Sequence, residues 1–313
     1  MNPLVSIIIP NYNHSKYLDL RIQSCLNQTF QNFEIIILDD CSRDNSKEII
    51  EKYNKHPKVT NIIYNNTNSG STFIQWNKGF ELAKGKYIWI AESDDFCEEK
   101  LLELLVIKLE EEKNNVVSFC RSQFVDENGI KIPPFINKEN QEKTYNGKTF
   151  ISLFMADANI INNASSALFR SDIIPLISSE YMKYKAAGDR LFWINLAKHG
   201  NVCMLKSPLN YFRQHPIKVS PSKLIDGTTF YEDYNIVKNL FSENYISKYR
   251  IFFIKNHYIN IANKINEMPN HVRENIYKLW EYPRFIPLKI ISLIDLIYYY
   301  ILRLSIKYND IFK

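Results

Sequence analysis

Glycine is scarce in this chain of 313 residues: only eight glycines occur, and none of them are clustered. The phosphate-binding patterns G-x-G-x-x-G and G-x-x-x-x-G-K-[ST] are therefore both absent. These patterns let backbone N–H groups approach the phosphates of a nucleotide closely. Their absence argues against a dinucleotide-binding Rossmann enzyme and against a P-loop NTPase. Any nucleotide must be held by another kind of site.

Cysteine and histidine are also sparse, and neither shows the spacing of a zinc site. The five cysteines form no C-x-x-C pair, and the six histidines form no H-x-x-x-H or H-E-x-x-H pattern. A G-x-S-x-G nucleophile elbow is missing as well. No signal peptide is expected, because the apolar run Val5–Ile9 is short and no basic segment precedes it. We therefore expect free thiols in a reducing cytosol and a cytoplasmic protein.

The net charge is only +5, from 39 Lys and Arg residues against 34 Asp and Glu residues. This excess is too small to indicate nucleic acid, and no nucleic-acid partner is expected. The distribution says more: residues 206–313 hold 16 basic and nine acidic residues, whereas the remainder holds 23 and 25. The mildly acidic residues 1–205 and the basic segment 206–313 together indicate that the partner is an anionic surface.

Apolar β-branched runs alternate with amphipathic segments in the first half of the chain. This order is typical of an α/β fold with a mostly parallel sheet flanked by helices on both faces. Residues 121–160 look irregular, and the chain is mainly helical from about residue 224. The expected strands are 4–9, 34–38, 59–64, 86–91, 115–120, 164–170, 201–205 and 209–213. The expected helices are 14–28, 42–53, 71–84, 98–112 and 188–199.

Three polar clusters follow expected strands: Pro10–Asn13, Asp39-Asp40 and Glu92–Asp95. In open α/β sheets, ligands bind beyond the carboxyl ends of the strands. Acids packed together repel each other unless a cation or backbone N–H groups compensate, and a divalent metal prefers such hard oxygen ligands. Asp94 and Asp95 are thus candidate metal ligands. The alternative is that these acids only cap the helix that follows.

Asp39 and Asp40 can accept hydrogen bonds from a base N–H or a ribose hydroxyl, or they can cap the next helix. Tyr12 can stack on a base, or it can simply be half-buried surface. Asp189 follows Gly188 and opens a helix with an aromatic face. Such surroundings raise the pKa of a carboxyl group, which suits a general base. The alternative is a first-turn acid that favours the helix dipole.

His215 is a candidate metal ligand, or it can form a hydrogen bond to a phosphate; the alternative is a lone surface histidine. It closes the segment Tyr211–His215, in which Arg213 is a candidate contact to phosphates.

Taken together, these motifs resemble the opening of family 2 glycosyltransferases, in the family's order and spacing over about residues 4–110. A looser resemblance extends through Gly188-Asp189-Arg190 and Tyr211–His215 to about residue 222. The segments that carry it are Val5–Asn13, Ser24–Phe33, Asp39–Asp44, Asn68–Gly70, Asn77–Gly79, Gly85–Ile88 and Ser93–Asp95.

The resemblance implies a GT-A fold that binds a nucleotide-diphospho-sugar and inverts the anomeric centre by single displacement. Residues 1–222 would be the catalytic domain, with a nucleotide-binding half (1–110) and an acceptor-side half (111–222), and 223–313 a helical extension. Mg²⁺ or Mn²⁺ would be held by Asp94 and Asp95, with His215 as a further ligand, and Asp189 would be the catalytic base. Asp40 would bond to uracil while Asp39 supports its loop. The implied nucleotide-binding residues are Pro10, Asn11, Tyr12, Asp39, Asp40, Asn77 and Asp94.

Two residues depart from the family pattern: Glu92 replaces the usual first Asp, and Trp76 replaces an Arg that commonly contacts the diphosphate. No Q-x-x-R-W motif occurs, which argues against a processive synthase. In view of the resemblance, we predict transfer of one sugar from a UDP-linked donor to a growing surface glycan or lipid-linked oligosaccharide. One rival is a sugar nucleotidyltransferase, which needs a Gly-rich N-terminal loop. The other is a non-catalytic glycan-binding or scaffold protein, and the acids at 94, 95 and 189 argue against it.

Residues 286–307 are very apolar, yet Lys289, Asp295 and Arg303 interrupt them. The longest uncharged run, Leu296–Leu302, is far shorter than the ~20 residues of a membrane-spanning helix. On a helix, the polar side chains share an arc of about 120°. This pattern predicts peripheral contact with a membrane, and the alternative is packing on the catalytic domain or in a homodimer. The arc comprises Lys289, Ser292, Asp295, Tyr299, Arg303 and Lys307.

Overall fold

The computed structural model describes residues 2–133, 142–215, 219–282 and 287–308. The side chains of 219–221, 288, 299 and 301–308 lie outside this description. The chain forms two compact units, which interleave along the sequence. The sheet unit comprises Met1–Gly147, Ile161–Met182 and Phe192–Pro216, and the helical unit comprises Lys148–Ile160, Lys183–Leu191 and Ile217–Lys313. The predicted boundary at residue 222 stays a prediction, and Asp189 belongs to the helical unit.

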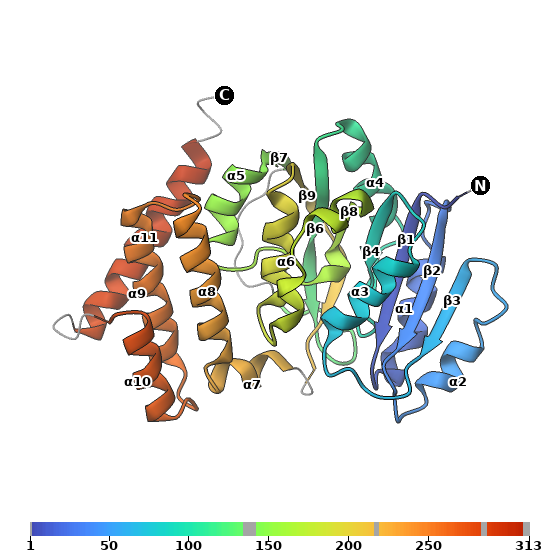
Figure 1. Ribbon diagram of the computed structural model, residues 1–313, viewed down its shortest axis with the longest axis horizontal. Helices are drawn as coiled ribbons and strands as arrows, with labels where there is room; N and C mark the ends of the chain where they lie inside the picture. Colours follow the sequence, from blue (N-terminus) through green and yellow to red (C-terminus); the bar gives the residue numbers. More distant parts are fainter. Residues whose placement is uncertain (1, 134–141, 216–218, 283–286, 309–313) are drawn as a thin grey trace. The chain divides into compact units, whose positions relative to one another are not determined.

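The sheet unit contains a nine-stranded sheet in which the order is β3-β2-β1-β4-β8-β6-β9-β5, with β7 paired to β9 (Figure 1). The β3-β2-β1-β4 part is parallel, as is the β6–β9 pair, whereas β8, β5 and β7 pair antiparallel with their neighbours. The α/β fold class is thus confirmed, and the sheet is mixed beyond β4. The strands are β1 (Val5–Asn11), β2 (Phe33–Asp39), β3 (Val59–Tyr64), β4 (Tyr87–Ile90), β5 (Phe96–Cys97), β6 (Asn115–Val125), β7 (Lys143–Asn146), β8 (Ala167–Arg170) and β9 (Asn201–Arg213).

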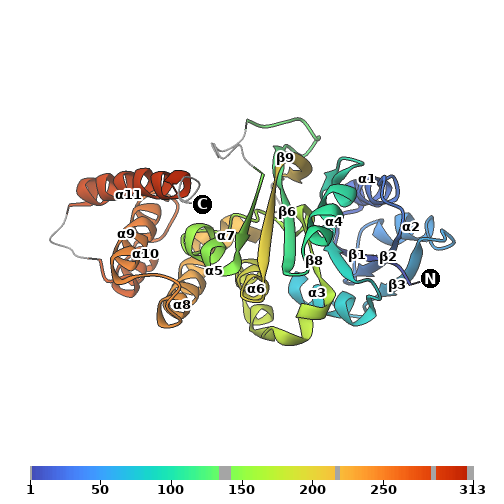
Figure 2. The same cartoon turned by 90° about the horizontal axis from the view of Figure 1, so that it is seen from above.

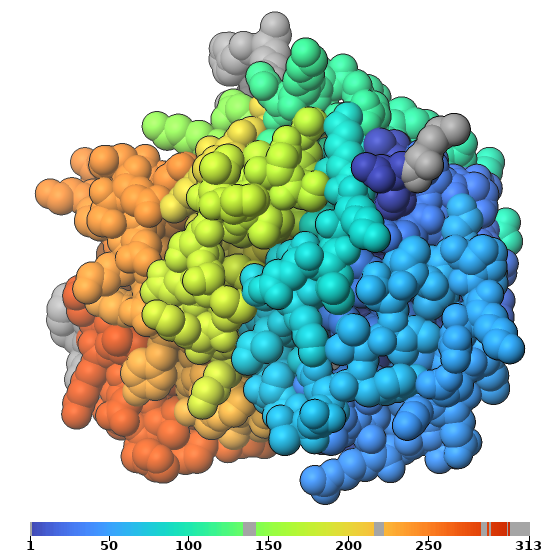
Figure 3. All heavy atoms as spheres, turned by 45° about the vertical axis from the view of Figure 1, so that its right-hand side comes forward, coloured from blue at the N-terminus to red at the C-terminus, as the bar shows by residue number. Residues whose placement is uncertain are grey.

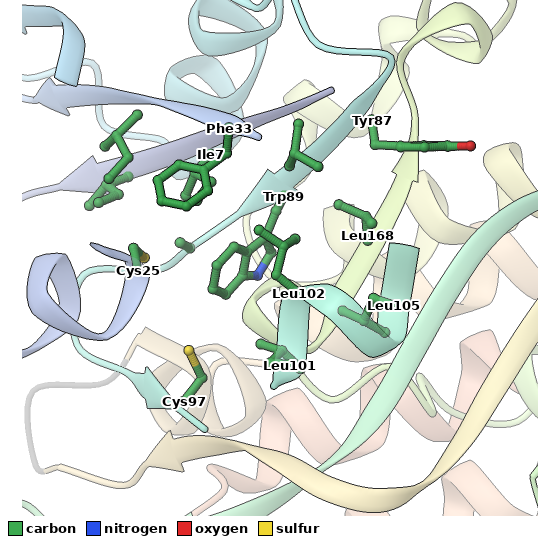
Figure 4. Packing of buried hydrophobic residues seen from close by; sticks show 14 of the residues in the cluster. Ile7, Cys25, Phe33, Tyr87, Trp89, Cys97, Leu101, Leu102, Leu105 and Leu168 are labelled. Carbon is green, nitrogen blue, oxygen red and sulfur yellow. The ribbon is translucent and has the colours of Figure 1, made fainter. Parts of the chain in front are cut away.

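Helices cover both faces of the parallel strands, as the continuous apolar runs predict. Seen from above, α1 (Ser15–Leu26) and α4 (Leu101–Glu111) lie on one side of β1, and α3 (Thr72–Leu82) lies on the other (Figure 2). On the α1 and α4 side, Trp89 sits among leucines of α4 and Cys25 of α1 (Figure 4). On the other side, a Cβ at Gly79 would lie 2.5 Å from Ile8 Cγ2, so only glycine lets α3 pack this closely. The short helix α2 (Ser46–Glu51) follows β2.

Aromatic rings join α3 to later segments of the sheet unit. The rings of Phe73 and Tyr181 lie 6.2 Å apart, and those of Trp76 and Phe192 lie 5.6 Å apart. The cyan atoms of the α3 region adjoin the yellow-green atoms of these later segments in Figure 3.

The structure differs from the prediction between residues 115 and 213. Strand β6 continues to Val125, and β7 forms within the region predicted to be irregular. The strands expected at 201–205 and 209–213 are one strand, β9. Its ladder with β6 passes through a register shift that pairs Arg121 with Pro208, where the exposed residues 206–208 break the apolar pattern. The exposed bulge made one strand look like two.

The helical unit contains α7 (Val219–Ile225), α8 (Thr228–Ser242), α9 (Lys248–Lys264), α10 (Asn270–Leu279) and α11 (Leu288–Tyr308). Helix α5 (Gly147–Phe150) starts at the division between the units, and α6 (Gly188–Ala197) runs across it. Arg190 fixes this unit internally: its guanidinium donates to the carbonyl oxygens of Met155 and Ala156, to Asp233 Oδ1 at 2.5 Å and to Tyr258 Oη at 2.7 Å.

Helix α11 packs on α9 through part of its polar arc. Asp295 is buried and accepts from Asn260 Nδ2 at 2.6 Å, with His257 Nδ1 2.9 Å away, and Ser292 Oγ donates to Asn260 Oδ1 at 2.7 Å. Ser292 and Asp295 of the polar arc therefore face α9, which offers them polar partners. Residue 286 and the side chains of Tyr299, Arg303 and Lys307 lie outside the described residues. No described helix is both long and apolar enough to cross a membrane.

Candidate active site

The carboxyl ends of β1 and β2 meet, as predicted. Asn11 pairs with Asp39 in the sheet, and Asn11 Nδ2 donates to Asp39 Oδ1 at 2.7 Å. Asp39 also accepts from the backbone N–H of Ser42 at 2.9 Å and from its hydroxyl at 2.6 Å. These bonds close a tight turn in which Cys41 takes the left-handed conformation (φ 62°). Asp39 thus holds this turn together, and its predicted role in nucleotide binding stays a prediction.

Asp40 is buried, and its carboxylate accepts several hydrogen bonds from the protein. Asn65 Nδ2 donates at 2.6 Å, Gln75 Nε2 at 2.9 Å, and Ser69 at 2.7 Å from its hydroxyl and 2.9 Å from its backbone N–H. A carboxylate has about four lone-pair positions. A uracil N–H would therefore have to replace one of these donors, and this role of Asp40 stays a prediction.

The other predicted nucleotide contacts differ in their surroundings. Tyr12 is 43% exposed, so its ring is open for stacking on a base. Pro10 is buried in β1. Asn77 donates to Glu81 Oε1 at 2.9 Å, one turn along α3, which engages its amide within the helix. The roles of Pro10, Tyr12 and Asn77 stay predictions.

The acidic loop after β4 is held by groups that the sequence did not reveal. Trp76 Nε1 donates to Glu92 Oε1 at 2.8 Å, so the two residues that depart from the family pattern are partners. Burial, together with the charge of Asp94, raises the pKa of Glu92 to about 8. The buried Arg21 donates through Nε to the carbonyl oxygen of Glu92 at 3.0 Å. This fixed cation offsets part of the negative charge of the loop.

Asp95 is the most enclosed acid of this loop. Its Oδ1 accepts from the backbone N–H of Arg213 at 3.0 Å, and its Oδ2 accepts from Asn163 Nδ2. Burial and the neighbouring charge of Asp94 raise its pKa. Both oxygens thus bond to the protein, which suits a residue that fixes the loop. The prediction that Asp95 is a metal ligand remains untested.

Asp94 lies beside two imidazoles. His215 Nε2 is 3.0 Å from Asp94 Oδ2, and the side chains are only 5% and 15% exposed. One ligand atom each of His14, Asp94 and His215 lie within 4.8 Å of one another, and this is the only such group of metal-ligating side chains in the described part of the chain. Two imidazole nitrogens and a carboxylate oxygen form a donor set that fits a divalent cation. His215 was singled out from the sequence; His14 was not.

Arg213 has another role than the phosphate contact considered from the sequence. It is buried, and its guanidinium donates to the carbonyl oxygens of Asp94 at 2.8 Å and Glu127 at 3.0 Å. The guanidinium carbon lies 4.5 Å from the ring centroid of Tyr17 and 5.3 Å from that of Phe96. Arg213 thus ties β9 to the acidic loop through the main chain.

Asp189 begins α6 and is half-buried. Its Oδ1 accepts from the backbone N–H of Arg190 and its Oδ2 from Asn159 Nδ2, both at 2.8 Å. Burial raises the pKa of Asp189 to about 6, and the negative charge of Asp233 acts in the same direction against the hydrogen bonds and Arg190. A carboxylate with this pKa can accept a proton near neutral pH.

A model of the glycosyl transferase family 2 matches residues 6–170. The glycosyltransferase GlyG of Streptococcus pneumoniae is 37% identical over 37% of this chain and 38% of its own length. The poly(ribitol-phosphate) β-N-acetylglucosaminyltransferase TarP of Staphylococcus aureus is 27% identical over 66% of this chain and 62% of its own length. The matches thus span less than two thirds of either relative.

Among solved structures, S. aureus TarS 1–349 in complex with UDP-GlcNAc has a TM-score of 0.61. The alignment covers 97% of this chain and 92% of TarS 1–349 at 20% identity. The likeness establishes a shared fold.

Proposed function

Because the chain belongs to glycosyl transferase family 2, we propose that it transfers one sugar from a nucleotide-diphospho-sugar to a hydroxyl group. The observation that carries this proposal is the pairing of Asp94, in the loop after β4, with His215, which follows β9; Asp94 Oδ2 and His215 Nε2 are 3.0 Å apart. The Asn11–Asp39 pair lies at the carboxyl ends of β1 and β2, which are parallel to β4. Ligands of such sheets bind beyond this edge. The nucleotide-bound TarS structure supports a UDP-linked donor.

In this proposal, Asp94 and His215 hold a divalent cation, Mg²⁺ or Mn²⁺, and Asp95 fixes their loop. When bound, the cation supplies positive charge that stabilises the departing diphosphate. Tyr12 stacks on the base, and the turn held by Asp39 receives the nucleoside. The buried Arg21 keeps the acidic loop in place by bonding to the carbonyl oxygen of Glu92.

Asp189 is the base in this proposal. Its carboxylate removes the proton from the acceptor hydroxyl while the hydroxyl oxygen attacks the anomeric carbon, and the bond to the diphosphate breaks. A single displacement of this kind inverts the anomeric configuration. Two hydrogen bonds orient this carboxylate. Asn159 Nδ2 donates to Oδ2, and the backbone N–H of Arg190, in the first turn of α6, donates to Oδ1.

A binding and turnover experiment tests the proposal. UDP- and GDP-sugars are screened by thermal shift with Mn²⁺, where a ligand at a hundredfold excess over Kd stabilises by about 2.7 kcal/mol. Release of UDP from the sugar that binds is then measured. Asp94→Asn should abolish Mn²⁺-dependent binding and release, whereas Asp172→Asn, which changes an acid that is 65% exposed, should not. A wild-type chain that binds no nucleotide sugar would overturn the proposal.

The remaining prediction for Asp95 has its own variant. If Asp95 ligates the cation directly, Asp95→Ala abolishes Mn²⁺-dependent UDP binding in a folded protein. If it only fixes the loop, Mn²⁺-dependent binding weakens but persists.

We further propose that the acceptor is a surface glycan or lipid-linked intermediate, reached at an anionic bilayer through α11. TarP, named for a polymer acceptor, supports a glycan-type acceptor. On α11, Asp295 is buried and Ser292 half-buried against α9, while several large apolar side chains are exposed beside the exposed Lys289. The basic excess of residues 206–313 complements anionic lipids, at about 1 kcal/mol per Lys or Arg near the surface. The outward residues are Ile290, Leu293, Leu296, Ile297 and Tyr300, each 47–68% exposed.

Co-sedimentation with phosphatidylglycerol vesicles tests this surface. The chain should pellet with them and not with phosphatidylcholine vesicles. Leu296→Glu should reduce binding at least about tenfold, because immersing a Leu side chain stabilises by ~1.5–3 kcal/mol. Leu176→Glu is the matched control, since Leu176 is 62% exposed and Leu296 68%. Absence of wild-type pelleting, or a dimer that only Leu296→Glu dissociates, would overturn the bilayer as the partner.

A further inference from the structure

His14 sits where the N-terminus of α1 meets the loop after β4. Its ring is 5.6 Å from the His215 ring, centroid to centroid, at an interplanar angle of 79°. Ligand atoms of His14, Asp94 and His215 are mutually within 4.8 Å. Bonds of about 2.0–2.2 Å around one ion place its ligand atoms roughly 3–3.5 Å apart. The 3.0 Å between His215 Nε2 and Asp94 Oδ2 already has this spacing, and His14 needs only a small side-chain adjustment.

The backbone of His14 is pinned on both sides by the loop after β2. Asn13 takes the left-handed conformation (φ 55°), and its backbone N–H donates to Ser42 Oγ at 2.9 Å. On the other side, the N–H of Ser15 donates to Asp44 Oδ2 at 2.8 Å. The carbonyl oxygen of His14 accepts the first bonds of α1, from Tyr17 at 2.9 Å and Leu18 at 3.0 Å. The imidazole therefore projects from a fixed point.

The ring itself is also oriented. His14 Nδ1 lies 2.8 Å from Ser93 Oγ, a contact inside the loop that carries Asp94. When Nδ1–H donates to this hydroxyl, Nε2 keeps its lone pair, which is the usual arrangement of a metal-binding histidine.

We propose that His14 is a third protein ligand of the divalent cation, which is then held by two imidazoles and one carboxylate. The inference rests on the proposed cation site of Asp94 and His215 and adds a residue and a selectivity to it. Imidazole is a ligand of transition-metal ions such as Zn²⁺, whereas Mg²⁺ prefers oxygen ligands and keeps several of its waters. The second imidazole makes the site prefer the transition-metal ions over Mg²⁺. Asp94 keeps the cation within reach of a diphosphate.

Metal binding, measured without turnover, tests this assignment. Mn²⁺ affinity is determined by electron paramagnetic resonance, alone and with UDP, and Mg²⁺ is titrated as competitor. The visible spectrum of bound Co²⁺ reports its nitrogen ligands. His14→Ala should weaken Mn²⁺ binding at least about tenfold and change the Co²⁺ spectrum. His14→Gln, which keeps a polar group for Ser93, should do the same while preserving the thermal midpoint.

Two further variants make the result specific. His14→Asp replaces the imidazole with a carboxylate and should retain Mn²⁺ while reducing the preference for Mn²⁺ over Mg²⁺. His199→Ala removes an exposed imidazole of the same unit and should change nothing.

The outcomes separate this inference from the proposed function. If Asp94→Asn and His215→Ala lose Mn²⁺ while His14→Ala binds it as the wild type does, His14 is not a ligand and the proposed function stands. If the wild-type chain binds no Mn²⁺ with or without UDP, the cation site itself is refuted.

Discussion

Replacing the proposed base, Asp189→Asn, tests the reaction at its chemical step. The amide keeps the size of the side chain: its oxygen can accept from the backbone N–H of Arg190, and its NH2 group can donate to the amide oxygen of Asn159 once that amide turns over. It cannot take a proton from the acceptor. We expect donor binding to be unchanged and kcat to fall by ~10²–10⁴, the usual loss when a general base is removed.

The pH dependence of the wild-type protein gives the sharper number. With the pKa of Asp189 at about 6, its carboxylate fraction falls about tenfold between pH 7 and pH 5. An Asp with its ordinary pKa of about 3.9 would lose less than about a tenth of its carboxylate over the same range. The charged groups that act on Asp189 are Asp233, which raises the pKa, and Arg190, which lowers it. kcat/KM should therefore fall about tenfold on acidification.

The assay is UDP release at several pH values with a saturating cation and acceptor. Asp189→Asn should show no comparable fall in its residual rate. Asn159→Ala removes a donor to the carboxylate and should move the acidic limb to higher pH. Because burial favours the neutral carboxyl group, Asp189→Asn should be at least as stable as wild type at pH 8, which controls for unfolding. Turnover by Asp189→Asn within threefold of wild type, or a flat wild-type profile from pH 5 to 7, would refute the reasoning.

Two stability predictions concern buried polar pairs. Trp76→Phe keeps an aromatic ring but leaves Glu92 without its indole donor, so the free energy of unfolding measured in urea should fall by ~1–3 kcal/mol. Glu92→Gln can still accept this hydrogen bond, so it should lower the free energy of unfolding by less. Arg190→Met leaves the buried Asp233 without its charged partner and should lower the free energy of unfolding by ~3–5 kcal/mol. A decrease below about 1 kcal/mol would show that this pair contributes little to the stability of the helical unit.

The convergence at the ends of β1, β2 and β4 could be predicted from the sequence. Continuous apolar runs mark buried parallel strands, and each run stops at a polar residue that therefore lies at the same edge. The contact between Asn11 and Asp39 follows from this rule. The irregular strand β9 could not be predicted, because its exposed bulge at Pro208 interrupts the pattern while the ladder continues.

The partners within the site could not be predicted, because they come from elements far apart in the chain. His14 precedes α1 and His215 follows β9, and only the fold brings them together. Helix α11 shows a related limit. Its periodicity does not reveal which polar residues face the protein, because that depends on the side chains of α9. His257 and Asn260 supply the polar partners that bury Asp295.

The pair of Trp76 and Glu92 illustrates why departures from a family pattern should be examined together. Taken singly, Trp76 removes a cation and Glu92 moves a carboxyl group by one methylene, and each looks like a loss of function. In the structure the indole N–H donates to that carboxyl group, so each residue accounts for the other. The hydrogen bond ties one oxygen of Glu92 to α3, while Asp94 pairs with His215. The loop thus keeps one carboxylate beside the imidazoles, which is the arrangement that the proposed cation site requires.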